Sequence, residues 1–159
     1  MRSLLTATTL VLVAATATPQ TFSGEVVKVV DGDTIDVQQG GRVRRVRLVD
    51  IDCPEWTQAY GQRAKNATAR LALHKTVSVH RTGLDPNGRI LAEVTLPDGR
   101  NLNRELVTDG LAWRYPHRSL DPSLAALEAQ ARAARRGLWV DAHPVPPWEF
   151  RRHETRPVH

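Results

Sequence analysis

Acidic side chains gather at two places in the sequence, each of them next to a β-branched or apolar segment. The first group lies around the turn DGD, and the second lies in VRLVDIDCPEW, residues 46–56. Their members are Asp31, Asp33 and Asp36, and Asp50, Asp52 and Glu55. Carboxylates that are brought together repel one another unless a cation lies between them, and oxygen-only ligands favour Ca²⁺ or Mg²⁺ over zinc. Asp31 fits an ordinary Asp-Gly turn, but two clusters at the ends of neighbouring strands indicate a hard-cation site.

Arg47 is the most informative basic residue in the sequence. It lies between Val46 and Leu48 in the most apolar part of an expected strand, where a charge needs a phosphate or a carboxylate as partner. Arg47 and Asp52 are five positions apart, so a regular strand would point them to opposite faces. They can share a site only if the chain bends or bulges between them. The spacing therefore predicts a bend in this segment.

Several other kinds of site are excluded by the residue types present. Cys53 is the single cysteine, which excludes an intramolecular disulfide and a zinc site built from several thiolates. The histidines form no metal cluster, and the sequence has no nucleophile elbow, phosphate-cradling glycine loop or CxxC motif. The loop DPNGR lacks the length and the acids of an EF-hand, so we interpret it as a turn that presents Arg89.

The first residues have the layout of a secretory signal peptide. Residues 1–17 contain one positive charge at Arg2, then an apolar and small-residue run, then Ala15-Thr16-Ala17. We expect cleavage near Ala17 and an exported protein that is not in the membrane in its mature form. The alternative is an uncleaved membrane anchor, for which the apolar run is short.

The formal net charge is +5, and only three of the 22 basic residues are lysines. Because the planar guanidinium group suits phosphate, an arginine-rich surface favours polyanion partners. Genomic base composition also raises arginine usage, so the charge alone does not identify the partner.

The hydrophobic patterns predict one α+β domain over residues 18–140, built on a small barrel. Strands are expected at 24–30, 34–38, 43–49, 76–80 and 89–96, as an antiparallel meander. A first helix is expected at 57–74, with Thr57 as its N-cap. A second is expected to begin after Asn103, which is its expected N-cap. A third is expected from Pro122, with Asp121 as N-cap and Gly137 just past its end. Residues 141–159 contain four prolines and are expected to form an extended tail, with Trp148 and Phe150 packed against the domain.

Six segments in order between residues 26 and 139 carry a resemblance to a known family. They are VVKVVDGDTIDV, VRLVDIDCPE, YGQRA, DPNGRILAEV, NLNRELVTDGLAW and ALEAQARAARRGLW. This succession resembles the staphylococcal nuclease (thermonuclease) family, whose fold is a five-stranded OB-type β-barrel with three helices. The resemblance covers nearly the whole expected mature domain.

The resemblance implies a calcium-dependent nuclease that cleaves the phosphodiester bonds of DNA and RNA at the 5′-oxygen and leaves 3′-phosphates. Matched position by position, the calcium ligands are Asp33, Asp52 and the carbonyl of Cys53, the general base is Glu55, and the phosphate-binding arginines are Arg47 and Arg89. These residue types suit the reaction, because a carboxylate can deprotonate water and guanidinium groups can stabilise a phosphoryl transition state.

The segment RYPHRSLD departs from the family, since an ungapped match places Pro116 and Arg118 where the family has nucleotide-stacking tyrosines. Tyr115, His117 and Arg118 are therefore the candidate substrate-binding residues. We expect a monomer. Two alternatives remain at this point: a catalytically inactive module that binds nucleic acid or protein on the same fold, and a secreted barrel that binds another polyanion. The complete set of acids and arginines favours the enzyme.

Overall fold

The computed structural model describes residues 20–154, so the expected signal peptide at residues 1–17 lies outside the described residues. Within residues 20–154, no helix is long and apolar enough to cross a membrane.

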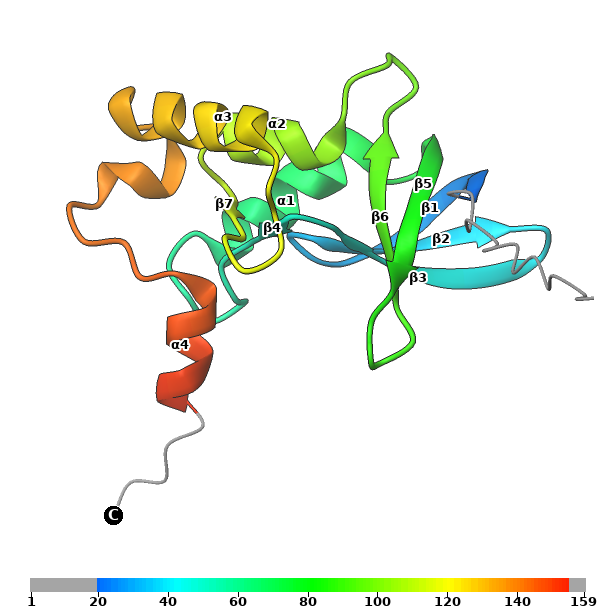
Figure 1. The fold of residues 1–159 in the computed structure, drawn as a ribbon. Helices are drawn as coiled ribbons and strands as arrows, with labels where there is room; N and C mark the ends of the chain where they lie inside the picture. The colour runs from blue at the N-terminus through cyan, green and yellow to red at the C-terminus, as the bar shows by residue number, and fades with distance from the viewer. Residues whose placement is uncertain (1–19, 155–159) are drawn as a thin grey trace, which may run out of the picture.

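Five strands form a closed barrel, which confirms the predicted fold class (Figure 1). Neighbouring strands follow the order β1-β2-β3-β6-β5, and all pairs are antiparallel except β3 with β6. The expected meander therefore closes through one parallel pair. The strands are β1 (Thr21–Asp31), β2 (Thr34–Gln39), β3 (Arg42–Leu48), β5 (Thr76–Leu84) and β6 (Ile90–Thr95).

A second, two-stranded sheet pairs β4 (Ile51–Asp52) with β7 (Trp113–Arg114). The sequence did not predict it, because two residues are too few to show an alternating pattern. This short pair is important for the site, since it holds the acidic segment after β3 against the segment that leads to Tyr115.

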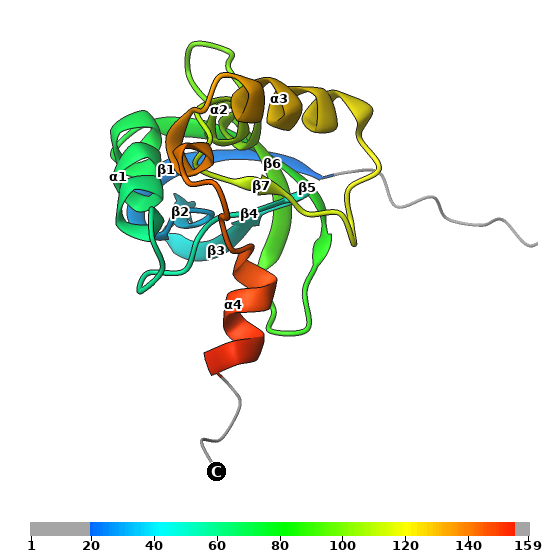
Figure 2. The same ribbon diagram turned by 90° about the vertical axis from the view of Figure 1, so that its left-hand side faces the viewer.

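The helices are α1 (Gly61–Ala72), α2 (Leu102–Thr108), α3 (Pro122–Ala133) and α4 (Pro147–Glu154), with a 3₁₀ turn η1 (Gly137–Val140). The expectation of three helices is corrected to four in the described chain, because α4 lies in the tail that was expected to be extended. In Figures 1 and 2, α2 and α3 lie above β4 and α4 lies below it.

Three helix boundaries differ from the expectation. Helix α1 begins four residues after Thr57, at Gly61, and its N-cap is Tyr60. Helix α2 is capped by Asn101, whose side chain accepts a hydrogen bond from the N–H of Arg104 at 3.1 Å. Helix α3 ends at Ala133, before the expected glycine. The predicted start of α3 is confirmed, because Asp121 accepts a hydrogen bond from the N–H of Ser123 at 2.8 Å and Pro122 follows it.

Asn103 is buried rather than capping, and its amide nitrogen donates to the carbonyl of Val49 at 2.9 Å and to that of Ala92 at 3.3 Å. A polar side chain in the core needs such partners, because an unpaired buried amide is costly. Asn103 thus ties α2 to the end of β3 and to β6. It fixes the helix layer on the barrel.

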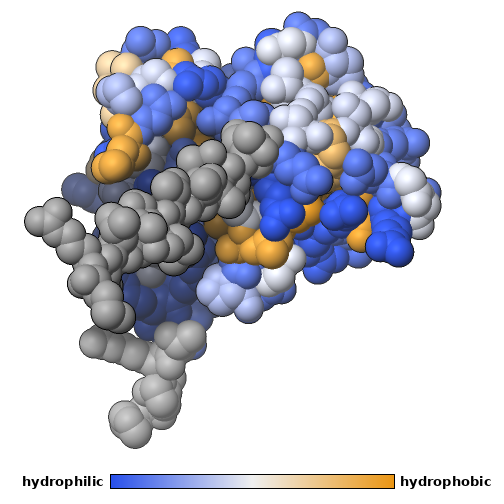
Figure 3. Space-filling model, turned by 45° about the vertical axis from the view of Figure 1, so that its right-hand side comes forward, coloured by the Kyte–Doolittle hydropathy of each residue, from blue (hydrophilic) through white to orange (hydrophobic). Residues whose placement is uncertain are grey.

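The core fills the barrel and continues beneath α1 and α2. Its fully buried members come from every barrel strand and from both helices: Val26, Ile35, Val37, Val46, Leu48, Val77, Val79, Ala92, Val94, Ala64, Leu102 and Leu106. The face seen in Figure 3 is mostly hydrophilic, with small separate hydrophobic patches. The barrel interior is therefore filled by apolar side chains rather than open to a ligand.

Candidate active site

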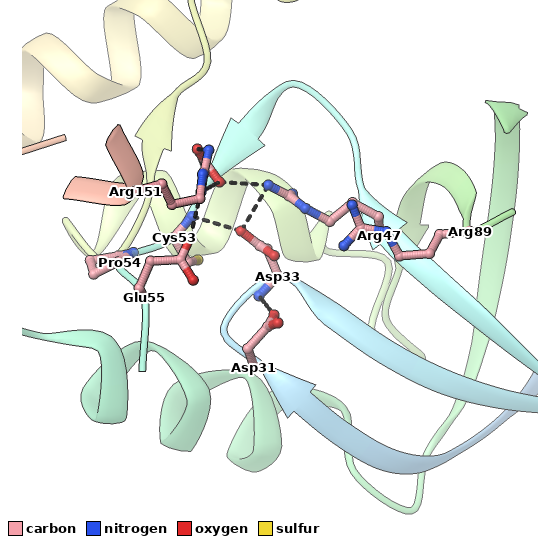
Figure 4. A pocket seen from close by; sticks show the side chains of 9 residues that line it. Asp31, Asp33, Arg47, Cys53, Pro54, Glu55, Arg89 and Arg151 are labelled. Carbon is pink, nitrogen blue, oxygen red and sulfur yellow. Dashed lines mark hydrogen bonds and ion pairs between the residues drawn. The ribbon is translucent and has the colours of Figure 1, made fainter. Parts of the chain in front are cut away.

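One pocket brings together members of both acidic clusters at the edge of the barrel (Figure 4). Asp36 instead pairs with Arg45, and Asp50 lines an adjoining pocket. The acidic pocket has a volume of about 360 Å³. It contains every catalytic and metal-binding candidate that the resemblance implied, together with three further residues: Asp33, Arg47, Asp52, Cys53, Glu55 and Arg89, with Asp31, Pro54 and Arg151. These side chains come from the β1–β2 turn, β3, the segment after it, the β5–β6 hairpin and α4.

The predicted bend between Arg47 and Asp52 is confirmed. Asp50 has a φ of 66°, a left-handed conformation that is uncommon outside glycine, and it separates β3 from β4. The Nη2 atom of Arg47 then lies 2.7 Å from Asp52 Oδ1. Its Nη1 donates to the carbonyls of Leu48 and Ile51 at 2.7 and 2.9 Å. The guanidinium group therefore spans the bend that brings its carboxylate partner to the same face.

Asp33 lies at the centre of the pocket and is 5% exposed. Its Oδ2 accepts a hydrogen bond from the N–H of Cys53 at 2.7 Å and lies 3.1 Å from Arg47 Nη2. Burial raises the pKa of Asp33 to about 7, against the opposing effect of Arg47, and the charges of Asp31 and Asp52 add to the rise. Because Arg47 is shared with Asp52, it does not fully compensate Asp33.

The turn that carries Asp33 has little room for variation. Asp31 Oδ1 accepts a hydrogen bond from the N–H of Asp33 at 3.1 Å, which fits the turn role expected for Asp31. A Cβ at Gly32 would lie 2.7 Å from Cys53 Cβ and 2.8 Å from Ala64 Cβ. Glycine is required at this position because the acidic turn packs directly on the segment after β4 and on α1.

Cys53 is the conspicuous residue of the motif, but its side chain is buried and its pKa is raised well above the ordinary thiol value by burial and by Asp33. The thiol is therefore neutral at physiological pH and is a poor nucleophile. Its backbone N–H holds Asp33 in place.

The carboxylates fit a hard cation. Asp33 and Asp52 converge on the same Arg47 nitrogen, and both offer oxygen atoms, which Ca²⁺ and Mg²⁺ prefer. No group of three His, Cys, Asp or Glu side chains within residues 20–154 is arranged to hold a metal. A cation bound here would therefore take its remaining ligands from backbone carbonyls, water or substrate oxygens.

The raised pKa of Asp33 predicts a pH dependence of the cation-free protein. Between its ordinary pKa of 3.8 and the folded-state value of about 7, the folded protein holds a proton that the unfolded chain has released. This contribution to the free energy of unfolding is complete below pH 3.8 and is lost as the pH rises through about 7. In chelator, we expect the free energy of unfolding to fall by on the order of 2–4 kcal/mol over this range because of Asp33.

Urea unfolding in chelator at a series of pH values measures this effect. The isosteric Asp33→Asn variant cannot titrate at this position, so its stability should fall less steeply than that of the parent protein. Equal slopes for the two proteins would contradict the assigned ionisation.

Glu55 lies at the exposed side of the pocket, with 36% of its side chain accessible. Its N–H donates to Gln58 Oε1 at 3.1 Å, which fixes the backbone of the turn before α1. Its carboxylate forms an ion pair with Arg151. A carboxylate that is both anchored and accessible to water suits proton abstraction.

Arg89 lies at the base of the β5–β6 hairpin, where the sequence predicted a presenting turn. Asp85 accepts hydrogen bonds from the N–H of Arg89 at 2.9 Å and from its Nε at 2.5 Å. Gly88 has a φ of 77°, which glycine adopts without steric cost. Asp85, which does not line this pocket, therefore holds the side chain of Arg89 toward it. The guanidinium nitrogens of Arg89 other than Nε can then bind a ligand.

A second pocket of about 190 Å³ adjoins the first and shares Arg47, Asp52, Arg89 and Arg151 with it. Of the three substrate-binding candidates, Tyr115 and Arg118 line this second pocket, whereas His117 lines neither. The ring of His117 instead lies 5.5 Å from the ring of Tyr115.

Arg151 is the pocket residue that sequence reasoning missed. Its Nη2 lies 2.8 Å from Asp52 Oδ2, and its Nη1 pairs with Glu55 Oε1. It lies in the proline-rich segment that was expected to be extended. The order of Pro147, then Glu149, then basic residues through His153 was a usable signal, because proline and acids favour the first turn of a helix and bases favour the last.

Comparison with known proteins agrees with this geometry. Residues 45–141 match the family described as "Staphylococcal nuclease homologue". The chain is 47% identical to an uncharacterized endonuclease from Escherichia coli over 128 residues, which cover 80% of this chain and 84% of that protein. It is 39% identical to a protein named micrococcal nuclease from Shigella flexneri over 156 residues, which cover 92% of this chain and 90% of that protein. The chain belongs to the staphylococcal nuclease family.

A further relative shows that the likeness reaches beyond the barrel. The chain is 43% identical over 155 residues to the Escherichia coli protein named ParB, a match that covers 91% of this chain and 88% of that protein. The family match ends at residue 141, before α4 begins.

Proposed function

We propose that this protein is an exported, calcium-dependent nuclease that hydrolyses phosphodiester bonds of DNA and RNA and leaves 3′-phosphate ends. The observation that carries the proposal is the single pocket that holds the carboxylates of Asp33, Asp52 and Glu55 together with Arg47 and Arg89. Membership of a nuclease family supports the substrate class. Export rests on the signal-like residues 1–17, and we propose a monomeric mature form outside the membrane.

The arginines bind and stabilise the phosphate. Arg89 presents guanidinium N–H groups that match phosphoryl oxygens, and the Nη2 of Arg47 would turn to the phosphate once Asp33 and Asp52 bind a cation. Such bonds are strongest where negative charge develops. Arg47 is preorganised by the carbonyls of Leu48 and Ile51, so little reorganisation accompanies the reaction. Asp33, Asp52 and the carbonyl of Cys53 would hold Ca²⁺. When bound, the ion supplies neutralising charge to the phosphate.

Glu55 acts as the general base. Its carboxylate accepts a proton from a water molecule as the water oxygen forms a bond to phosphorus. The bond from phosphorus to the 5′-oxygen breaks, and that oxygen leaves with the electron pair and takes a proton from solvent. The phosphate stays on the 3′-oxygen of the upstream fragment.

Tyr115 and Arg118 form the nucleotide-binding side of the site, and His117 supports it through its contact with the ring of Tyr115. Tyr115 and Arg118 line the pocket that adjoins the acidic one, so a strand whose phosphate lies between Arg47 and Arg89 has an aromatic ring and a further cation beside it. Stacking on an aromatic ring tolerates every base, which fits a nuclease of broad specificity.

The direct test uses the purified mature protein, residues 18–159. Plasmid DNA, denatured DNA and RNA should be degraded in the presence of Ca²⁺, and degradation should stop when a chelator is added in excess. A folded protein that cleaves none of these substrates with Ca²⁺, Mg²⁺ or Mn²⁺ would instead indicate an inactive binding module on the same barrel.

A further inference from the structure

Helix α4 carries a basic side chain into the acidic pocket from a part of the chain outside the barrel. Arg151 lies 2.8 Å from Asp52 Oδ2 through its Nη2, and its Nη1 pairs with Glu55 and lies 3.5 Å from Asp52 Oδ1 (Figure 4). The proposed metal ligand and the proposed general base are therefore bridged by one guanidinium group.

Packing that does not involve Arg151 holds the helix in this place. The ring of Trp148 lies 5.7 Å from that of Trp113 and 5.5 Å from that of Tyr115, at edge-on or tilted angles that aromatic pairs prefer. The side chain of Gln58 donates to the carbonyl of Val145, just before the helix. Thr57 Oγ1 donates to Glu154 at 3.3 Å near the helix end. These contacts keep Arg151 at the pocket whether or not its ion pairs are made.

Asp52 has a guanidinium group on each of its oxygens, and the two groups differ in how firmly they are held. The Arg47 side chain is 15% exposed and also donates to two backbone carbonyls. The Arg151 side chain is 43% exposed and reaches the pocket from an outer helix. If Asp52 turns an oxygen to a divalent cation, Arg151 is the partner that gives way, because its side chain is much more exposed than that of Arg47.

A displaced Arg151 would remain beside phosphate-binding groups. It lines both the acidic pocket and the adjoining pocket, and each of these is also lined by Arg47 and Arg89. The adjoining pocket continues to Tyr115 and Arg118. Arg151 thus lies at the junction between the place proposed for the scissile phosphate and the place proposed for the neighbouring nucleotide.

We propose that Arg151 is a third phosphate-binding arginine, which moves from Asp52 and Glu55 to a phosphate of the nucleic-acid strand when the cation and the substrate bind. This inference rests on the proposed nuclease function. It makes the C-terminal helix a part of the substrate site. The opposite role, a side chain that blocks the acids and inhibits the enzyme, predicts opposite effects of its removal.

The first experiment measures binding of a fluorescent single-stranded oligonucleotide by anisotropy in Ca²⁺, with all proteins in the non-cleaving Glu55→Gln background. Arg151→Ala should weaken binding about tenfold, as expected for the loss of one charge-assisted phosphate contact. The slope of log binding constant against log salt should become shallower by about 0.7. Arg151→Lys should keep the charge and part of the affinity. The matched control is Arg152→Ala, which removes the same charge from the next position of α4 and should change neither quantity.

The second measurement is steady-state cleavage at saturating Ca²⁺ without the Glu55 substitution. Arg151→Ala should raise KM with a smaller effect on kcat, and thermal unfolding checks that each variant is folded. If Arg151→Ala does not fold, Arg151→Gln replaces it.

Three outcomes overturn the proposal. Equal affinities of Arg151→Ala and Arg152→Ala would show that Arg151 does not contact the strand. Tighter binding or faster cleavage by Arg151→Ala would identify an inhibitory contact. If the protein with Arg151 intact neither binds nor cleaves the oligonucleotide, the proposed nuclease function fails as well, and that result is visible before any variant at position 151 is compared.

Discussion

Glu55→Gln is expected to lower kcat for DNA cleavage by about 10²- to 10⁴-fold, the range typical for loss of a general base. The amide cannot accept a proton from water, yet it has nearly the shape of the carboxylate. The side chain is on the exposed side of the pocket, so stability should change little. Initial rates at saturating substrate and Ca²⁺, with thermal unfolding of the same preparations, measure both expectations.

Glu149→Gln is the matched control for this substitution. Glu149 lies on α4 and is exposed, and it does not line the acidic pocket. Its replacement should leave kcat unchanged. Undiminished cleavage by Glu55→Gln would remove Glu55 from the mechanism, whatever the effect of the control.

Arg47→Ala is expected to reduce both stability and activity. It leaves the buried carboxylates of Asp33 and Asp52 without their shared partner, and removing one member of a buried ion pair typically costs about 3–5 kcal/mol. Loss of a donor that stabilises the transition state should lower kcat by about 10²- to 10³-fold. Chemical unfolding in chelator and cleavage rates in Ca²⁺ measure the two effects separately.

Two further variants make this prediction specific. Arg47→Lys keeps the charge but not the forked geometry that reaches two carbonyls and two carboxylates, so it should be intermediate in stability. Arg45→Ala is the matched control on the same strand. Its guanidinium pairs with the buried carboxylate of Asp36 at 2.8 Å, but its own side chain is 49% exposed, so the loss should be about 1–2 kcal/mol, smaller than that of Arg47→Ala. Equal stabilities of Arg47→Ala and Arg45→Ala would contradict the assigned role of Arg47.

The barrel was predictable from the sequence because its strands are short, β-branched and separated by turn residues. A bend between Arg47 and Asp52 was also predictable, since the two could share a site only if the regular alternation was broken. Family resemblance then assigned roles to residues that periodicity could not place. The distances in the pocket required the structure, because they depend on how a turn, a strand end and a hairpin meet.

Other features were harder to predict, and each has a physical reason. The N-cap of α2 is Asn101 rather than Asn103, because burial in the core competes with capping for the same residue type. Helix α4 is short and is stabilised by contacts of Trp148 with distant aromatic residues, so local propensity alone was a weak signal. The approach of Arg151 to Asp52 follows from that packing and from no sequence motif.

The most direct test of the proposed chemistry is cleavage of a single-stranded oligonucleotide with Ca²⁺ in heavy-oxygen water, followed by mass spectrometry of the new ends. Water activated by Glu55 should attack phosphorus and expel the 5′-oxygen, so the label should appear in a 3′-phosphate, and the opposite fragment should carry an unlabelled 5′-hydroxyl. The Glu55→Gln protein should give little of either product. Labelled 5′-phosphates, or cleavage that continues undiminished in excess chelator, would contradict the account.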